Sequence, residues 1–180
     1  ALSYDSLKIT KTLSDPTPVP DWIAFTVVGP NVDPTPQTYT RTFYHNPTLG
    51  QTYSIADLVA NGWTLPNLLP GIYTVTETVA DPSDYTRVTT YTVSNPASSG
   101  TGTVATVATA SGLVPVVAFT NAYSRDEGTL IVDKTLSGIS AEQLATLTLS
   151  VAGPDDFTAT TKTFTLAPTG DQGDLADLIA

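Results

Sequence analysis

The sequence predicts an all-β protein: a β-sandwich that is repeated in tandem and carries one short crossover helix. Three observations carry this prediction. Short runs rich in Val, Thr, Tyr and Ile recur along the chain, clusters of Pro, Gly, Asn and Asp separate them, and one stretch of sequence occurs twice. Cysteine and methionine are absent and only 13% of the residues are charged, which suits an exported β protein. Since no disulfide can form, a covalent link of another kind would be useful to such a chain.

The strands follow from alternation, because successive side chains of a strand point to opposite faces of its sheet. Apolar residues at every second position therefore indicate a strand with one buried face. About seven such strands make one immunoglobulin-like sandwich. The strands predicted for the first repeat lie near residues 6–13, 22–28, 38–44, 71–79, 85–93, 103–109 and 114–122.

One short helix is predicted between the third and fourth of these strands. Ser54 is a typical N-cap with Asp57 three residues later, Leu58 belongs to the apolar side, and Asn61 and Gly62 end the helix. The helix is expected to cover the sandwich as a crossover. By contrast, the Pro, Ser and Gly residues of segment 95–102 predict a mobile hairpin tip.

The repeat predicts two domains. Residues 7–14 (LKITKTLS) recur as residues 130–137 (LIVDKTLS), and residues 25–30 (FTVVGP) correspond to residues 149–154 (LSVAGP). A third correspondence joins residues 56–60 (ADLVA) to residues 176–180 (ADLIA). We therefore predict a complete domain over residues 1–124 and, over residues 125–180, the N-terminal part of a second, homologous sandwich that is truncated here.

Three polar residues occupy inward-facing positions near the ends of three predicted strands. Each of them continues the apolar, buried face of its strand. Lys11 follows Leu7 and Ile9, Glu77 follows Tyr73 and Val75, and Asn121 follows Val117 and Phe119. An amine, a carboxyl and a carboxamide in one dry core are costly unless they satisfy one another. The pattern therefore predicts that these three side chains meet.

Two interpretations of this cluster remain open on the sequence alone. In the first, burial lowers the pKa of the lysine so that neutral Lys11 attacks Asn121, while a protonated Glu77 hydrogen-bonds the Asn121 carbonyl and passes protons to the departing ammonia. Contact between the reacting groups would supply the effective concentration for this single-turnover self-modification, which is not an enzyme activity. In the second, Lys11 and Glu77 form a buried ion pair and Asn121 is a spectator.

Three segments carry a family resemblance: residues 7–13 (LKITKTL), 69–78 (LPGIYTVTET) and 117–123 (VAFTNAY). They resemble the signature strands of Cna B-type and pilin-shaft immunoglobulin-like domains of Gram-positive surface proteins. The resemblance implies a Lys-Asn isopeptide bond with a catalytic glutamate, and Lys11, Glu77 and Asn121 match that pattern in chain order. Lys134, which corresponds to Lys11 in the repeat, would be the crosslink lysine of the second domain.

The resemblance also implies a function and a location. It points to a structural stalk or shaft segment of a bacterial cell-surface adhesin or pilus-like protein, with neighbouring repeats of the same protein as its partners and no cofactor. The expected location is extracellular, on the bacterial surface, with attachment to the cell wall through regions outside this chain. The alternative is a ligand-binding adhesin module that recognises a host or matrix component, which an exposed aromatic-lined groove would favour.

Other functional classes are disfavoured by charge and motif content. The net charge of −10, from 17 acidic and 7 basic residues, argues against a nucleic-acid partner. No window approaches the roughly 18 apolar residues of a membrane span, so we expect no membrane insertion in this segment. His45 lacks an accompanying nucleophile pattern and no spacing matches a metal site, while Trp22 and Trp63 are expected to pack in the core or against loops.

Overall fold

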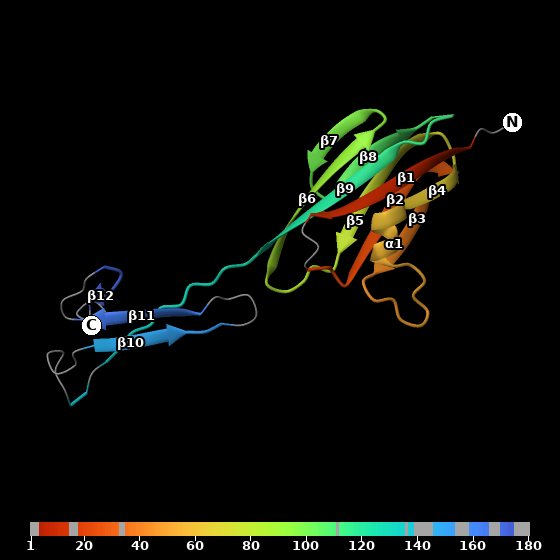
Figure 1. The fold of residues 1–180 in the computed structure, drawn as a ribbon. Coiled ribbons are helices and arrows are strands. Elements are labelled where there is room, and N and C mark those ends of the chain that lie inside the picture. Colours follow the sequence, from red (N-terminus) through yellow and green to blue (C-terminus); the bar gives the residue numbers. More distant parts are fainter. Residues whose placement is uncertain are drawn as a thin grey trace. The chain divides into compact units, whose positions relative to one another are not determined.

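The computed structural model describes residues 4–14, 18–32, 35–110, 112–135, 137–138, 146–153, 159–165 and 170–174. The chain divides into two compact units, Ala1–Glu127 and Gly128–Ala180, which are described separately. Apart from one short helix, the elements of the described residues are β-strands (Figure 1). The predicted fold class, an all-β sandwich with a short helix, is confirmed.

The first unit is a sandwich of two sheets. Its strands are β1 (Asp5–Ser14), β2 (Trp22–Val32), β3 (Thr35–Tyr44), β4 (Trp63–Leu68), β5 (Gly71–Val79), β6 (Tyr85–Ser94), β7 (Ala97–Thr101), β8 (Val104–Thr109) and β9 (Val116–Arg125). One sheet has the order β4-β1-β9-β6-β7 and the other has the order β3-β2-β5-β8. Within the described strands of this unit, β1 and β9 pair in parallel, whereas the other pairs are antiparallel. The first and last strands of the unit therefore lie side by side (Figure 1).

The core lies between the inner faces of the two sheets. Along β1, buried positions alternate with half-buried ones, so Leu7 and Ile9 enter the core together with Lys11. Phe25 from one sheet meets Phe119 from the other, with their ring centroids 5.5 Å apart. The alternation of apolar residues in the sequence thus predicts which side chains are buried. The same alternation places some polar residues in the core.

The predicted helix is confirmed as α1 (Ile55–Asn61). The Ser54 hydroxyl accepts a hydrogen bond from the Asp57 backbone N–H at 3.0 Å, which satisfies one of the free donors of the first turn. At the other end, the Gly62 N–H donates to the Leu58 carbonyl at 2.8 Å, and Gly62 has a φ of +72°, a conformation that favours glycine. Local sequence therefore determines both ends of the helix.

Two strands of the first unit were not predicted, and both lie at sheet edges. β4 contains Pro66, which reads as a strand breaker but is tolerated where one side of a strand has no partner. The hairpin predicted at residues 95–102 is present, with its turn at residues 95–96, but the segment is not a loop, because β7 occupies most of it and pairs with β6. The small polar residues of β7 show no apolar alternation, so its conformation comes from pairing with a neighbour and not from a local pattern.

Gly29 in β2 provides a test of core packing. A Cβ at this position would lie 2.0 Å from Cε1 of Tyr73, whose ring is fully buried and whose hydroxyl donates to the Leu69 carbonyl at 2.8 Å. Because this ring cannot move without losing packing, Gly29→Ala is expected to lower the free energy of unfolding by about 1–3 kcal/mol. Urea denaturation measures this loss. Gly128→Ala is the matched control, since its added Cβ meets no atom within 4 Å, and equal stability of the two variants would contradict the prediction.

The second unit contains a small sheet. Its strands β10 (Thr146–Val151), β11 (Thr160–Thr165) and β12 (Gly173–Asp174) follow the order β10-β11-β12, and β10 pairs antiparallel with β11. Residues 130–135, which repeat part of the β1 sequence, are not in a strand, and Lys134 is half-buried. Residues 136 and 176–180, on which part of the predicted repeat depends, lie outside the described residues. A second homologous domain therefore stays a prediction.

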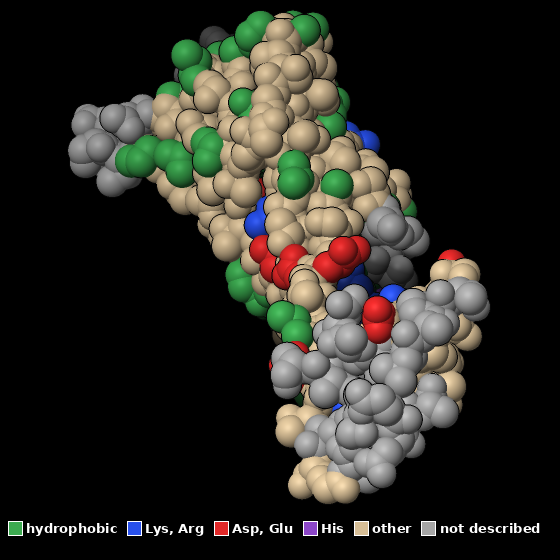
Figure 2. Space-filling model, turned by 90° about the vertical axis from the view of Figure 1, so that its left-hand side faces the viewer, with side chains coloured by type: hydrophobic (Ala, Val, Ile, Leu, Met, Phe, Trp, Pro, Cys, Tyr) green, Lys and Arg blue, Asp and Glu red, His purple; other side chains and the backbone are tan. Residues whose placement is uncertain are grey.

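One face of the molecule carries few charged groups apart from a cluster of acidic side chains. Figure 2 shows this face, most of whose described surface is neither charged nor hydrophobic, with hydrophobic groups in small patches and few basic groups. Threonines occur as neighbours across strands, as with Thr26 and Thr40, whose hydroxyl oxygens lie 3.3 Å apart. In the part of the chain that the structure describes, no helix has the length and apolar character needed to cross a membrane.

Candidate functional site

Lys11, Glu77 and Asn121 meet inside the core of the first unit. Their exposed fractions are 2%, 2% and 0%. Lys11 and Asn121 come from β1 and β9 of one sheet, and Glu77 comes from β5 of the facing sheet. Lys11 Nζ lies 2.8 Å from Glu77 Oε1, and Asn121 Nδ2 donates to the same oxygen at 3.4 Å. One carboxylate oxygen thus contacts both the amine and the carboxamide nitrogen.

Strand register explains how these residues come together. In the parallel pairing of β1 with β9, Lys11 is opposite Phe119 and Leu13 is opposite Asn121. Lys11 and Asn121 therefore sit two residues out of register on adjacent strands and share the inward face. Glu77 lies on the inward face of β5, so it approaches the pair from across the sandwich.

The surroundings of Lys11 make its neutral amine more accessible than that of an ordinary lysine. The pKa of Lys11 is lowered to about 8, because loss of hydration on burial and, to a smaller extent, the positive charge of Arg87 outweigh the opposing effect of the Glu77 carboxylate. Lys11 Nζ lies 2.8 Å from Glu77 Oε1 as a buried ion pair, and both the charge of Glu77 and its hydrogen bond with Nζ raise the pKa of Lys11. Burial outweighs these two effects, so the pKa of Lys11 remains below its usual range.

Two further residues of the site were missed in the sequence. Thr89 on β6 is 5% exposed, and its hydroxyl donates to Asn121 Oδ1 at 2.8 Å. Arg87, two residues earlier, donates from Nη1 to the Thr89 hydroxyl, and the same nitrogen lies 3.7 Å from Glu77 Oε2. A signal was present: in strand β6, Arg87 and Thr89 share the inward parity of buried Val93, as Lys11 shares that of Ile9.

An ion pair at the edge of the cluster orients Arg87. The guanidinium contacts the Asp81 carboxylate through Nε at 2.6 Å and through Nη2 at 3.2 Å. The Tyr123 hydroxyl donates to Asp81 at 3.3 Å, and burial together with the negative charge of Asp81 raises the pKa of Tyr123 to about 12. A two-point contact of this kind fixes the plane of the guanidinium and leaves Nη1 directed at Thr89.

The contacts of Asn121 differ from those expected. The sequence led us to expect Glu77 at the Asn121 carbonyl, but Glu77 meets the amide nitrogen and Thr89 meets the carbonyl oxygen. The two ends of the carboxamide thus have different partners. The difference arises because β6 neighbours β9 and brings Thr89 opposite Asn121, a pairing that no local pattern reveals.

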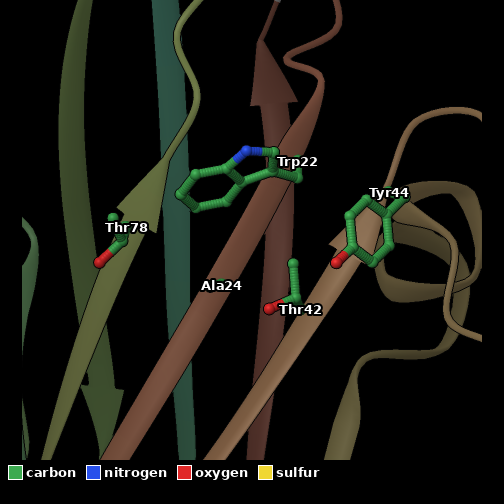
Figure 3. Close-up of a pocket in the computed structure, with 5 residues that line it drawn as sticks. All are labelled: Trp22, Ala24, Thr42, Tyr44 and Thr78. Carbon is green, nitrogen blue, oxygen red and sulfur yellow. The ribbon is translucent and has the colours of Figure 1, made fainter. Parts of the chain in front are cut away.

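A second candidate site is a hollow of about 380 Å³ on the outer face of the four-stranded sheet (Figure 3). Trp22 and Tyr44, which are paired across β2 and β3, line it together with Thr42, Ala24 and Thr78. Figure 3 shows the Trp22 ring between Thr78 and Tyr44. Trp63 packs in the core as predicted, at 6% exposure, whereas Trp22 is half-buried on the outer face.

Among the described residues, no group of three or more His, Asp or Glu side chains is placed so that it could hold a metal ion. His45 is exposed. It lines a separate, largely apolar hollow beside α1 that includes Leu13, Val19 and Val59.

Comparisons with known proteins give similarity to solved structures only. No protein-family model matches the chain, and no curated protein matches it. The major pilin of Streptococcus pyogenes matches with 13% identity and a TM-score of 0.39, over 67% of this chain and 48% of the pilin. The major pilin protein T-13 of Streptococcus pyogenes matches with 16% identity and a TM-score of 0.36, over 69% of this chain and 46% of that pilin. The chain thus covers about half of each matched structure, and at these scores any statement about function has to come from the site itself.

Proposed function

We propose that the first unit is a structural segment of a surface stalk or pilus-like shaft, stapled by a self-formed amide bond between Lys11 and Asn121. The observation that carries this proposal is the position of Glu77 Oε1, which contacts the Lys11 amine and the Asn121 amide nitrogen at once. An ion pair alone does not require the carboxamide at this oxygen. A condensation does, because a proton must pass from the attacking nitrogen to the departing one.

The proposed reaction balances without any added reagent. Lys11 Nζ first releases its extra proton to solvent. The neutral amine then forms a bond to Asn121 Cγ, and the electron pair of the carbonyl moves onto Oδ1. Glu77 accepts one proton from Nζ and delivers it to Nδ2. The electron pair then returns from Oδ1, the Cγ–Nδ2 bond breaks, and ammonia leaves. Glu77 ends as it began, and the product is a secondary amide that forms once per molecule.

The positions of the two linked strands support a mechanical role. Lys11 lies on the first strand of the unit and Asn121 on its last, so a bond between them closes a loop of about 110 residues. Tension applied along the chain would enter through β1, cross the amide and leave through β9. The strands between these residues would carry no load, and partial unfolding that admits proteases would be suppressed.

The intact mass of the purified chain tests the proposal. We expect a mass lower than that calculated from the sequence by one ammonia, because Nδ2 leaves when the amide forms. Lys11→Ala should show its full calculated mass, since it lacks the nucleophile. A folded wild-type chain at its full calculated mass would overturn the proposal. Lys11, Glu77 and Asn121 would then be only a buried polar cluster.

The wider context of this function is also proposed. The second unit is inferred to be the start of a homologous domain in which Lys134 takes the place of Lys11, so that neighbouring repeats would be the partners of the first unit. The resemblance to domains of Gram-positive surface proteins implies a location on the bacterial exterior, with cell-wall attachment through regions outside this chain.

The hollow at Trp22 favours a second candidate function, a ligand-binding adhesin module. An indole and a phenol ring flanked by threonine hydroxyls offer an apolar surface with hydrogen-bonding groups at its edge, which suits the apolar face of a sugar. The intact-mass measurement separates the two candidates. Full calculated mass would remove the staple and leave this hollow as the remaining basis for a function.

A further inference from the structure

We propose that Thr89 is a catalytic residue of the crosslinking reaction: its hydroxyl, oriented by Arg87, donates to Asn121 Oδ1 and stabilises the negative charge that develops there when Lys11 attacks. This inference rests on the proposed crosslink and extends it to residues on a fourth strand, β6. It assigns the oxygen side of the carboxamide to Thr89 and the nitrogen side to Glu77.

The direction of the hydrogen-bond chain is set by its first member. A guanidinium has only donors, so in the contact between Arg87 Nη1 and Thr89 Oγ1 the threonine oxygen must be the acceptor. The hydroxyl proton of Thr89 is then available for Asn121 Oδ1, 2.8 Å away. The remaining end of the carboxamide, Nδ2, faces the acceptor oxygen of Glu77. Each donor in the chain thus meets an acceptor.

The sheet holds this donor in place before any reaction. Thr89 and Asn121 are directly opposite each other in the antiparallel pairing of β6 with β9. The guanidinium of Arg87 donates two hydrogen bonds to the Asp81 carboxylate, so the guanidinium that donates to Thr89 is also fixed. A donor that is already directed at the oxygen requires no reorganisation when charge develops, which is why preorganised donors are effective in catalysis.

Burial increases the expected effect of this hydrogen bond. Asn121 is fully buried and Thr89 nearly so, so water cannot replace the hydroxyl as a donor to Oδ1. The positive charge of Arg87 polarises the hydroxyl and strengthens its donation. When Nζ bonds to Cγ and the carbonyl electron pair moves to Oδ1, the charge on that oxygen develops in a low-dielectric site where one donor matters most.

The test is the rate of crosslinking in Thr89→Val, which keeps the shape of the side chain and removes its hydroxyl. The full chain is isolated unlinked from inclusion bodies in denaturant, refolded by dilution and quenched at intervals, and the linked fraction is read from the intact mass. We expect linking to be slower by a factor of about 100, the usual effect of removing one such donor. Thr89→Ser, which keeps a hydroxyl, should restore most of the rate. Thr90→Val, on the exposed face of the same strand, should link at the wild-type rate.

The pH profile distinguishes chemistry from structure. Below about pH 8 the Lys11 amine is mostly protonated and cannot attack, so the wild-type rate should fall about tenfold per pH unit and level off above this value. Because Thr89 acts on the carbonyl and not on the amine, Thr89→Val should lower the whole profile without moving its midpoint. A shifted midpoint with an unchanged plateau would mean that Thr89 only supports the surroundings of Lys11, and it would overturn the inference.

Failure of the inference is separable from failure of the proposed function. A wild-type chain that folds but never loses ammonia overturns both. A wild-type chain that links, together with a Thr89→Val chain that links equally fast, overturns only the role of Thr89. Urea unfolding of Thr89→Val in a Lys11→Ala background, where no bond can form, reports any folding defect by itself. If that chain does not fold, the linking rate of Thr89→Ala is measured instead. A rate equal to that of the wild type would again overturn the role of Thr89.

Discussion

Replacing Lys11 by methionine is expected to lower the midpoint of thermal unfolding of the first unit by about 15–20 °C or more. A crosslink between Lys11 and Asn121 closes a loop of about 110 residues, and the chain-entropy treatment used for disulfides assigns roughly 4–5 kcal/mol to a closure of that size. For a unit of this length, about 1 kcal/mol shifts the midpoint by roughly 4 °C. Calorimetry of the wild-type and variant chains measures the difference.

A second variant separates the covalent bond from the charge that it replaces. Lys11→Met also leaves the Glu77 carboxylate buried without its closest cation, which adds a cost of its own. In the double variant Lys11→Met, Glu77→Gln this buried charge is gone, while the bond is still absent. The double variant should therefore recover part of the loss and remain well below the wild type. A double variant that melts at the wild-type temperature would mean that no covalent staple contributes to stability.

Replacing Glu77 by glutamine is expected to slow crosslinking by a factor of about 10² to 10⁴, the usual contribution of a positioned general acid–base group. Glutamine keeps the shape of the side chain but cannot accept a proton from Nζ and deliver it to Nδ2. The neutral amide also removes the negative charge that opposes the lowering of the Lys11 pKa. More of the amine would then be neutral at a given pH, so a slower reaction reports the loss of proton transfer and not the loss of nucleophile.

The time course of ammonia loss after refolding, followed by intact mass, measures this effect. Glu127→Gln makes the same chemical change at an exposed position and should link at the wild-type rate. Glu77→Gln should be recovered as a folded and largely unlinked chain. If it links as fast as the wild type, Glu77 is a packing partner of Lys11 and has no role in the chemistry.

Much of the site was predictable because burial in a sheet has a period of two. Lys11, Glu77 and Asn121 each follow apolar residues of the same parity, so the pattern of the sequence alone predicts their inward direction. The same parity placed Arg87 and Thr89 inward on β6. These two were missed because arginine and threonine are common on exposed strand faces, and only a partner on another strand distinguishes the buried ones.

The sequence by itself determined the all-β class, most strands of the sandwich, both caps of α1 and the inward direction of the three clustered residues. These features depend on neighbours a few residues apart, where alternation and capping act. The tertiary structure alone decided that β4 and β7 are edge strands, that β1 pairs in parallel with β9, and that Asn121 presents its oxygen to Thr89 and its nitrogen to Glu77. Each of these depends on strand order and register between segments far apart in the chain. Those are set by the packing of the whole sandwich and leave no local pattern in the sequence.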